Sequence, residues 1–116
     1  VSGMEIYYCK KPDIFENFSS KRFAELMGAR IRDSSGIEYR GIVHNDFSVL
    51  RNTEMPAILV ETAFITNKDD YGRLKSDDFR DKTASGIAQG IRMALDEIEA
   101  FEYEGDLYVY KQAGGR

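Results

Sequence analysis

Several residue types are scarce in this sequence, and each shortage excludes a class of structure or site. The single cysteine, Cys9, excludes an internal disulfide and a zinc cluster built from several cysteines. The single histidine, His44, cannot by itself supply a catalytic zinc site, which usually takes three protein ligands. No apolar stretch approaches the roughly 18 residues needed to cross a bilayer, so no membrane span is predicted.

Charge and motifs exclude further classes. The 16 Lys and Arg and the 20 Asp and Glu residues give a net charge of −4 with His neutral, so nucleic acid is not a predicted partner. Signatures of serine nucleophiles, phosphate-binding loops and dinucleotide-binding folds are absent.

The 116 residues, 42% hydrophobic and 31% charged, are typical of one globular domain. Because the chain begins Val-Ser-Gly without an export signal, we expect a piece of a longer protein.

Hydrophobic patterning predicts strands that alternate with helices. Strands are predicted at 3–9 and 57–60, short extended segments at 42–43 and 47–50, and helices at 17–33, from Thr66 or Asn67 onward, and from Ser76, Asp77 or Asp78 to about 99. The unbroken run Ala-Ile-Leu-Val at 57–60 is typical of a strand covered on both faces, so we interpret it as the central strand. The predicted fold class is α/β, with a mainly parallel sheet flanked by helices.

Local signals mark the ends and faces of the predicted helices. Asn17, Ser19 or Ser20 can cap the first helix, and Gly36 stands where a left-handed C-cap residue belongs. In the long helix Gly86 and Gly90 share a face, which indicates close packing against a neighbouring element. The tail predicts either an edge strand at 107–110 or a linker that ends in Gly114-Gly115.

Glu61 is the sharpest candidate for function. It follows the most apolar predicted strand directly, and ligand sites in open α/β sheets lie beyond the carboxyl ends of the strands. The alternative is a common strand-end acid that is either solvated or accepts a backbone N–H from the following loop. Arg51, at the end of the segment 47–50, is a candidate substrate-binding residue that could share the mouth of the site with Glu61, but a surface ion pair is the favoured interpretation.

Other chemically capable residues have simpler interpretations. His44 is predicted to be a polar surface or loop residue, and Cys9 a small buried residue in a strand. The acid pairs Asp69-Asp70 and Asp77-Asp78 point to different faces of a helix, so we interpret them as charges that stabilise helix starts rather than as an acid–base pair.

Residues 40–74 resemble the C-terminal part of the zinc-dependent N-acetylmuramoyl-L-alanine amidases of the amidase-3 type, which are cell-wall hydrolases. The matching motifs, in order, are Arg40-Gly41, Phe47, Val49-Leu50-Arg51, Met55-Pro56, Val60-Glu61, Phe64-Ile65-Thr66-Asn67 and Leu74. Upstream, GMEIYY at 3–8 is similar to the strand after the family's last zinc ligand, and the helix near 19–31 to the helix that follows it. The resemblance covers about residues 3–98.

The resemblance implies a function for Glu61. In this family, zinc held by two histidines and a glutamate activates water to cleave the amide between N-acetylmuramic acid and L-alanine. A second glutamate, at the position of Glu61, serves as the general base. The three zinc ligands of the family precede the strand that GMEIYY matches, so they are expected upstream of Val1, and zinc belongs to the complete domain. His44 occupies a position that is not a ligand, and Ala63 replaces the usual glycine.

Several expectations follow from this resemblance. Residues 1–100 are interpreted as the C-terminal portion of an amidase catalytic domain without its N-terminal strands, and 101–116 as an extension or linker. We expect the chain alone to be inactive, its partner to be peptidoglycan, its location to be extracytoplasmic, and its open sheet edge to promote self-association. The alternative function is a non-catalytic wall-binding or scaffolding module with the same fold.

Overall fold

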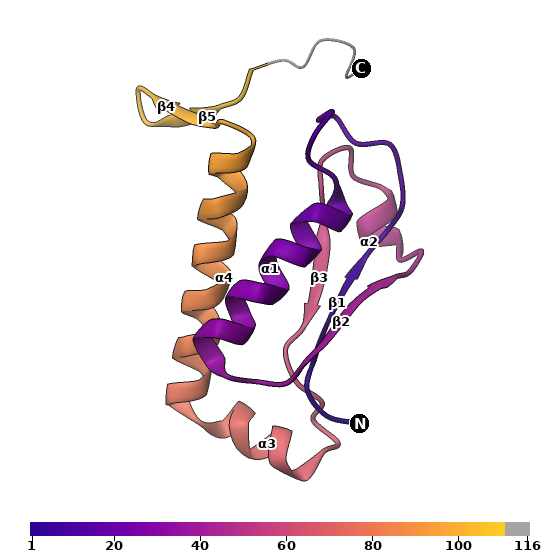
Figure 1. The fold of residues 1–116 in the computed structure, drawn as a ribbon, viewed down its shortest axis with the longest axis vertical. Helices are drawn as coiled ribbons and strands as arrows, with labels where there is room; N and C mark the ends of the chain where they lie inside the picture. Colours follow the sequence, from indigo (N-terminus) through magenta and orange to yellow (C-terminus); the bar gives the residue numbers. More distant parts are fainter. Residues whose placement is uncertain (111–116) are drawn as a thin grey trace.

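The structure, a computed structural model, describes residues 1–110 and places two helical layers beside a small sheet (Figure 1). Within these residues no helix is both long and apolar enough to cross a membrane. The elements in chain order are β1 (Met4–Tyr8), α1 (Ser20–Ser35), β2 (Tyr39–His44), α2 (Ser48–Arg51), β3 (Ile58–Glu61), α3 (Lys68–Lys75), α4 (Asp77–Glu97), β4 (Phe101–Tyr103) and β5 (Asp106–Tyr108).

The main sheet has the strand order β2-β1-β3, and its two pairings run in different directions. β1 is parallel to β2 and antiparallel to β3. The α/β class is confirmed, but within the described residues the sheet is mixed rather than mainly parallel. The prediction that 57–60 forms the central strand is wrong, because β3 lies at an edge of the three strands and β1 lies between its neighbours.

The core lies between one face of the sheet and α1. Met4, Ile6 and Tyr8 alternate along β1 and are buried against Met27 and Ile31 of α1. The opposite face carries Glu5 and Tyr7 of β1 and the exposed Leu59 of β3; α1 and α4 leave it uncovered, and the ring of Phe47, next to α2, packs on Tyr7 there. The pattern of 57–60 predicted burial on both faces, whereas Leu59 is exposed in the described part of the chain.

The helix caps follow the sequence signals closely. Ser19 caps α1 by accepting a hydrogen bond from the Arg22 N–H, and Gly36 ends the helix with a left-handed φ of 75°. Asn67 caps α3 by accepting from the Asp70 N–H, and Ser76 caps α4 by accepting from the Phe79 N–H. These predicted helix boundaries are confirmed because a cap needs only residues that are neighbours in sequence.

The segment 47–50 was predicted to be extended, and this prediction is wrong. The N–H groups of Leu50 and Arg51 donate to the Phe47 carbonyl, so Ser48–Arg51 forms the single-turn helix α2. Leu50 is buried and anchors this turn. A segment of four residues carries no usable periodicity, so its sequence could not distinguish a strand from a single helical turn.

Gly86 permits close contact between α4 and α1, which confirms the packing predicted from the helix glycines. A Cβ at Gly86 would lie 2.9 Å from the Ile31 Cα and 3.0 Å from the Arg30 carbonyl oxygen, both of them backbone atoms of α1. At Gly90 the nearest atoms belong to the side chain of Met27, which can move.

We therefore expect Gly86→Ala to lower the free energy of unfolding by about 1 to 3 kcal/mol, because backbone cannot yield to the added methyl group. Gly90→Ala should cost less, since the flexible Met27 side chain can shift. Gly72→Ala is the control: a Cβ there meets nothing within 4 Å, so helix propensity should raise stability by up to about 1 kcal/mol. Urea unfolding of the three variants measures this ranking of their stabilities. Equal stability of the Gly86 and Gly72 variants would contradict the prediction.

β4 and β5 form a separate antiparallel hairpin beyond α4 (Figure 1). Glu104 and Gly105 form its two-residue turn, both with positive φ, as the common hairpin turn requires. The edge strand predicted at 107–110 therefore pairs with β4 and not with the main sheet. Gly114-Gly115 lies outside the described residues, and the boundary near residue 100 stays a prediction.

Candidate active site

Glu61 is the last residue of β3 and lies opposite Glu5 of β1. Because β3 runs antiparallel to β1, the carboxyl end of β3 meets the amino end of β1. The sequence argument placed Glu61 among the carboxyl ends of parallel strands, and within the described residues this is wrong. The carboxyl ends of the parallel pair β1 and β2, at Tyr8 and His44, lie at the other end of the sheet.

The Glu61 side chain lies on the uncovered face of the sheet and is half-buried. Partners in an antiparallel register point to the same side, so Glu5 and Glu61 form one cross-strand pair, and Tyr7 and Leu59 form the next. The Phe47 ring packs edge-on against Tyr7, with ring centroids 5.5 Å apart. Glu61 thus stands at the border of a small apolar area, on a paired strand that holds its backbone in place.

Glu5, the residue opposite Glu61, contacts both Tyr7 and Arg40. The Tyr7 hydroxyl donates to Glu5 Oε1 at 3.0 Å, and Arg40 Nε lies 3.7 Å from Glu5 Oε2. The hydrogen bond to Glu5 raises the pKa of the Tyr7 phenol; burial and the charges of Glu5 and Glu61 raise it further, whereas Arg40 lowers it. Glu61 is therefore electrostatically coupled to Tyr7.

Arg40 is aimed at Glu5 by an irregularity in β2. Met4 pairs with Tyr39 and Ile6 with Ile42, so Arg40 and Gly41 together oppose the single residue Glu5. Gly41 has a φ of 102°, a conformation that favours glycine. Such a bulge redirects side chains, and here it explains why the Arg-Gly pair of the sequence is needed.

Asp70 fixes the loop that follows Glu61. Its carboxylate is fully buried and its Oδ2 accepts from the N–H of Gly3 at 2.8 Å and from the N–H of Phe64 at 2.9 Å. Arg73 Nη1 donates to Oδ1 at 2.8 Å. Burial alone raises the pKa of the Asp70 carboxyl, but the two N–H groups and Arg73 outweigh it and hold this pKa below its usual range.

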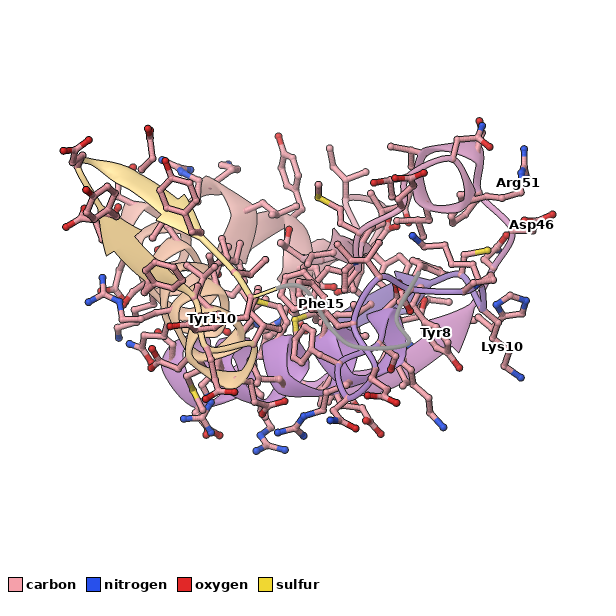
Figure 2. All side chains as sticks on the ribbon, turned by 90° about the horizontal axis from the view of Figure 1, so that it is seen from above. Tyr8, Lys10, Phe15, Asp46, Arg51 and Tyr110 are labelled. Carbon is pink, nitrogen blue, oxygen red and sulfur yellow. The ribbon has the colours of Figure 1, made fainter. Side chains whose placement is uncertain are left out.

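The structure does not bring Arg51 to Glu61. Arg51 ends α2 and forms an ion pair with Asp46 at 3.0 Å, and this contact lowers the pKa of the Asp46 carboxyl. Figure 2 shows Asp46 and Arg51 together at the edge of the molecule. Cys9, which directly follows β1, donates to Asp46 Oδ1 at 3.6 Å, so this ion pair lies at the opposite end of β1 from Glu61. The candidate arrangement of a shared mouth is wrong, and the favoured interpretation of Arg51 as a surface ion-pair residue is confirmed.

The remaining candidates have the simpler roles. His44 is exposed, and its Nδ1 accepts from the Lys10 N–H at 3.1 Å. Cys9 is buried as predicted, one residue beyond the strand, and burial raises the pKa of its thiol. Asp77 lies in the first turn of α4, as predicted. Asp70 lies in the first turn of α3 and, in addition, forms the tertiary contacts described above.

No group of three or more His, Cys, Asp or Glu side chains within residues 1–110 is arranged to hold a metal ion. Around Glu61 the neighbours are one further carboxylate, a phenol and a guanidinium, and this donor set does not fit a zinc site. An apolar cavity of about 330 Å³, lined among others by Phe15, Ile91 and Val109, contains none of the predicted site residues.

Sequence reasoning missed Glu5, Tyr7 and Arg40 as neighbours of Glu61. Alternation along 4–8 could have placed Glu5 and Tyr7 on one polar face of a strand. A single sequence carries no signal for which strand pairs with β1 or for the register of that pairing.

Comparison with known proteins places the chain in a family. A family model described as N-acetylmuramoyl-L-alanine amidase matches residues 1–93. The amidase LytC of Bacillus subtilis (strain 168) is 37% identical over 89 residues, which make up 77% of this chain and 17% of LytC. The endolysin of Bacillus phage SPP1 is 52% identical over 60 residues, which make up 52% of this chain and 22% of the endolysin.

Solved structures agree in fold as well as sequence. The N-acetylmuramoyl-L-alanine amidase from Clostridium difficile 630 superposes with a TM-score of 0.75 at 34% identity, over 83% of this chain and 50% of that one. The catalytic domain of CwlV, an amidase from Bacillus (Paenibacillus) polymyxa var. colistinus, gives 0.72 at 35% identity over the same shares. The chain thus spans about half the length of these structures and less of the curated relatives. It belongs to the N-acetylmuramoyl-L-alanine amidase family.

Proposed function

We propose that these residues form part of a peptidoglycan hydrolase that cleaves the amide between N-acetylmuramic acid and the L-alanine of the stem peptide. The observation that carries this proposal is the match of residues 1–93 to the amidase family together with the place of Glu61 at the end of a paired strand. Glu61 is the residue that the family resemblance assigns as general base. Peptidoglycan is the proposed partner, and the proposed location is extracytoplasmic, where that polymer lies.

The geometry of Glu61 suits proton transfer. A general base must stay within hydrogen-bonding reach of the proton that it removes, which requires a backbone that does not move. β3 pairs with β1 through four residue pairs that end at Glu61, and Asp70 holds the following loop through the Phe64 N–H. The Glu61 carboxylate can therefore take a proton from an attacking water and later give it to the leaving amine.

We propose that zinc takes part in the reaction of the complete domain and that its ligands are not among the described residues. The donors within residues 1–110 do not fit a zinc site, so we propose that the ligands are supplied by the rest of the domain, upstream of Val1. The chain alone should then be inactive. Arg51 stays a predicted substrate-binding residue, but its ion pair with Asp46 at the far end of β1 requires any such contact to be remote from Glu61.

The test is hydrolysis of purified cell walls by a polypeptide that joins these residues to the remaining half of an amidase domain. We expect release of new L-alanine amino groups, loss of that release with a chelator, and its return on adding zinc. The 116-residue chain alone, assayed in parallel, should release none. Binding to walls without any release by the joined polypeptide would instead support the wall-binding or scaffolding function.

A further inference from the structure

A row of three charged side chains crosses the uncovered face of the sheet at the end where Glu61 lies. Arg40 of β2, Glu5 of β1 and Glu61 of β3 occupy neighbouring positions on adjacent strands. The two acids face each other across the β1–β3 pair, and like charges in such a pair repel each other by about 0.2 to 1 kcal/mol. An arrangement that opposes folding in this way requires another explanation.

The two carboxylates of the row differ sharply in their contacts. Glu5 has both oxygens engaged, one by the Tyr7 hydroxyl at 3.0 Å and the other by Arg40 Nε at 3.7 Å, and its side chain is only 18% exposed. For Glu61 no side-chain hydrogen bond or ion pair forms within the described part of the chain. Glu5 on β1 therefore contacts both Tyr7 and Arg40, and Glu61 on β3 contacts neither.

Both donors are also within reach of Glu61. Tyr7 and Glu61 are diagonal neighbours across the β1–β3 pair, a separation of roughly 7 to 8 Å between backbones that a tyrosine side chain can span. The charge of Glu61 already contributes to the raised pKa of Tyr7. Arg40 lies two strands away, about 10 Å at ordinary strand spacing, which an arginine and a glutamate can bridge together.

We propose that Glu5 is a positioning residue that competes for Tyr7 and Arg40, keeping both away from Glu61 so that the Glu61 carboxylate stays open for the reaction. This inference rests on the proposed role of Glu61. A general base that accepts hydrogen bonds from a phenol and a guanidinium has its lone pairs occupied and is a poorer proton acceptor. Glu5 prevents that pairing, and the Arg40-Gly41 bulge holds Arg40 opposite Glu5 rather than farther along the sheet.

Titration of Tyr7 in the 116-residue chain tests this proposal without any enzymatic activity. Tyrosine labelled with ¹³C at Cζ gives one signal per ring, and Tyr7→Phe identifies the signal of Tyr7. In the natural sequence Tyr7 should titrate above the ordinary tyrosine value, and Glu61→Gln should lower its midpoint slightly. In Glu5→Thr, whose short side chain cannot take the place of the Glu5 carboxylate, the Tyr7 hydroxyl should turn to Glu61, so the Tyr7 midpoint should stay raised.

The decisive comparison is the effect of Glu61→Gln in two backgrounds. If Glu5 competes for Tyr7, Glu61→Gln should lower the Tyr7 midpoint at least twofold more in the Glu5→Thr background than in the natural sequence. An equal or smaller drop would overturn the proposal, because Tyr7 would then have turned to solvent instead. Should Glu5→Thr not fold, Glu5→Val removes the same carboxylate with another residue favoured in strands and is tested in the same way.

The result is independent of the proposed function. A failure of Glu61 as general base would appear in cell-wall hydrolysis and would leave the Tyr7 titration unchanged. A failure of the competition by Glu5 would appear in the titration and would leave hydrolysis by the unmodified domain intact.

Discussion

Glu61→Gln is expected to slow cell-wall hydrolysis by about 10²- to 10⁴-fold, the usual contribution of a general base. The assay uses the polypeptide that joins these residues to the remaining half of the domain. Glutamine keeps the shape and hydrogen-bonding reach of glutamate but cannot accept the proton, so the loss should fall on the catalytic rate. Glu54→Gln, at an exposed glutamate shortly before β3, is the matched control and should retain full activity.

Stability separates a catalytic role of Glu61 from a structural one. Because Glu61 faces Glu5, removing its charge relieves a like-charge pair, and we expect the free energy of unfolding to stay level or rise by up to about 1 kcal/mol. A residue that weakens the fold and is needed for activity has the character of an active-site group. Activity within twofold of the unmodified domain would remove Glu61 from the mechanism.

Asp70→Ala is expected to have the largest effect on stability, a loss of about 3 to 5 kcal/mol in the free energy of unfolding. The substitution leaves the N–H groups of Gly3 and Phe64 without their acceptor in a region closed to solvent. Arg73 contributes less to this loss, because its side chain is 45% exposed and water can solvate it. Urea unfolding of the 116-residue chain measures the effect.

Asp69→Ala provides the control for the Asp70 substitution. Asp69 precedes Asp70 in the same first turn of α3 but is exposed, so its loss removes only a favourable interaction with the helix dipole, worth less than about 1 kcal/mol. Equal losses in the two variants would mean that Asp70 acts only as a helix-start charge.

The lowered pKa of Asp70 also sets a pH dependence. The folded state favours the ionised carboxylate, so this contribution is fully present above the unfolded value of about 3.9 and is lost as the pH falls through the lower folded value. We expect stability to fall steeply with acidification below about pH 4, and the Asp70→Ala variant to fall less steeply over the same range.

Local features of this protein could be derived from the sequence because they depend on neighbouring residues. Ser19, Asn67 and Ser76 cap the helices that follow them, and each side-chain hydrogen bond closes within three residues. The glycine at 86 carried its own signal, since a glycine inside a long helix is unfavourable without a packing reason. Strand 4–8 showed the alternation of one buried and one open face.

The sequence by itself thus determined the helices α1, α3 and α4 with their N-terminal caps, the first strand and, through the Val-Glu motif, which acid to consider. Only the tertiary structure decided that β3 runs antiparallel at an edge, that Arg51 lies far from Glu61, and that Glu5 faces Glu61. Asp70 and Gly3 are 67 residues apart, and no local pattern relates them. Strand order and register follow from which surfaces exclude water together, and that choice belongs to the whole chain.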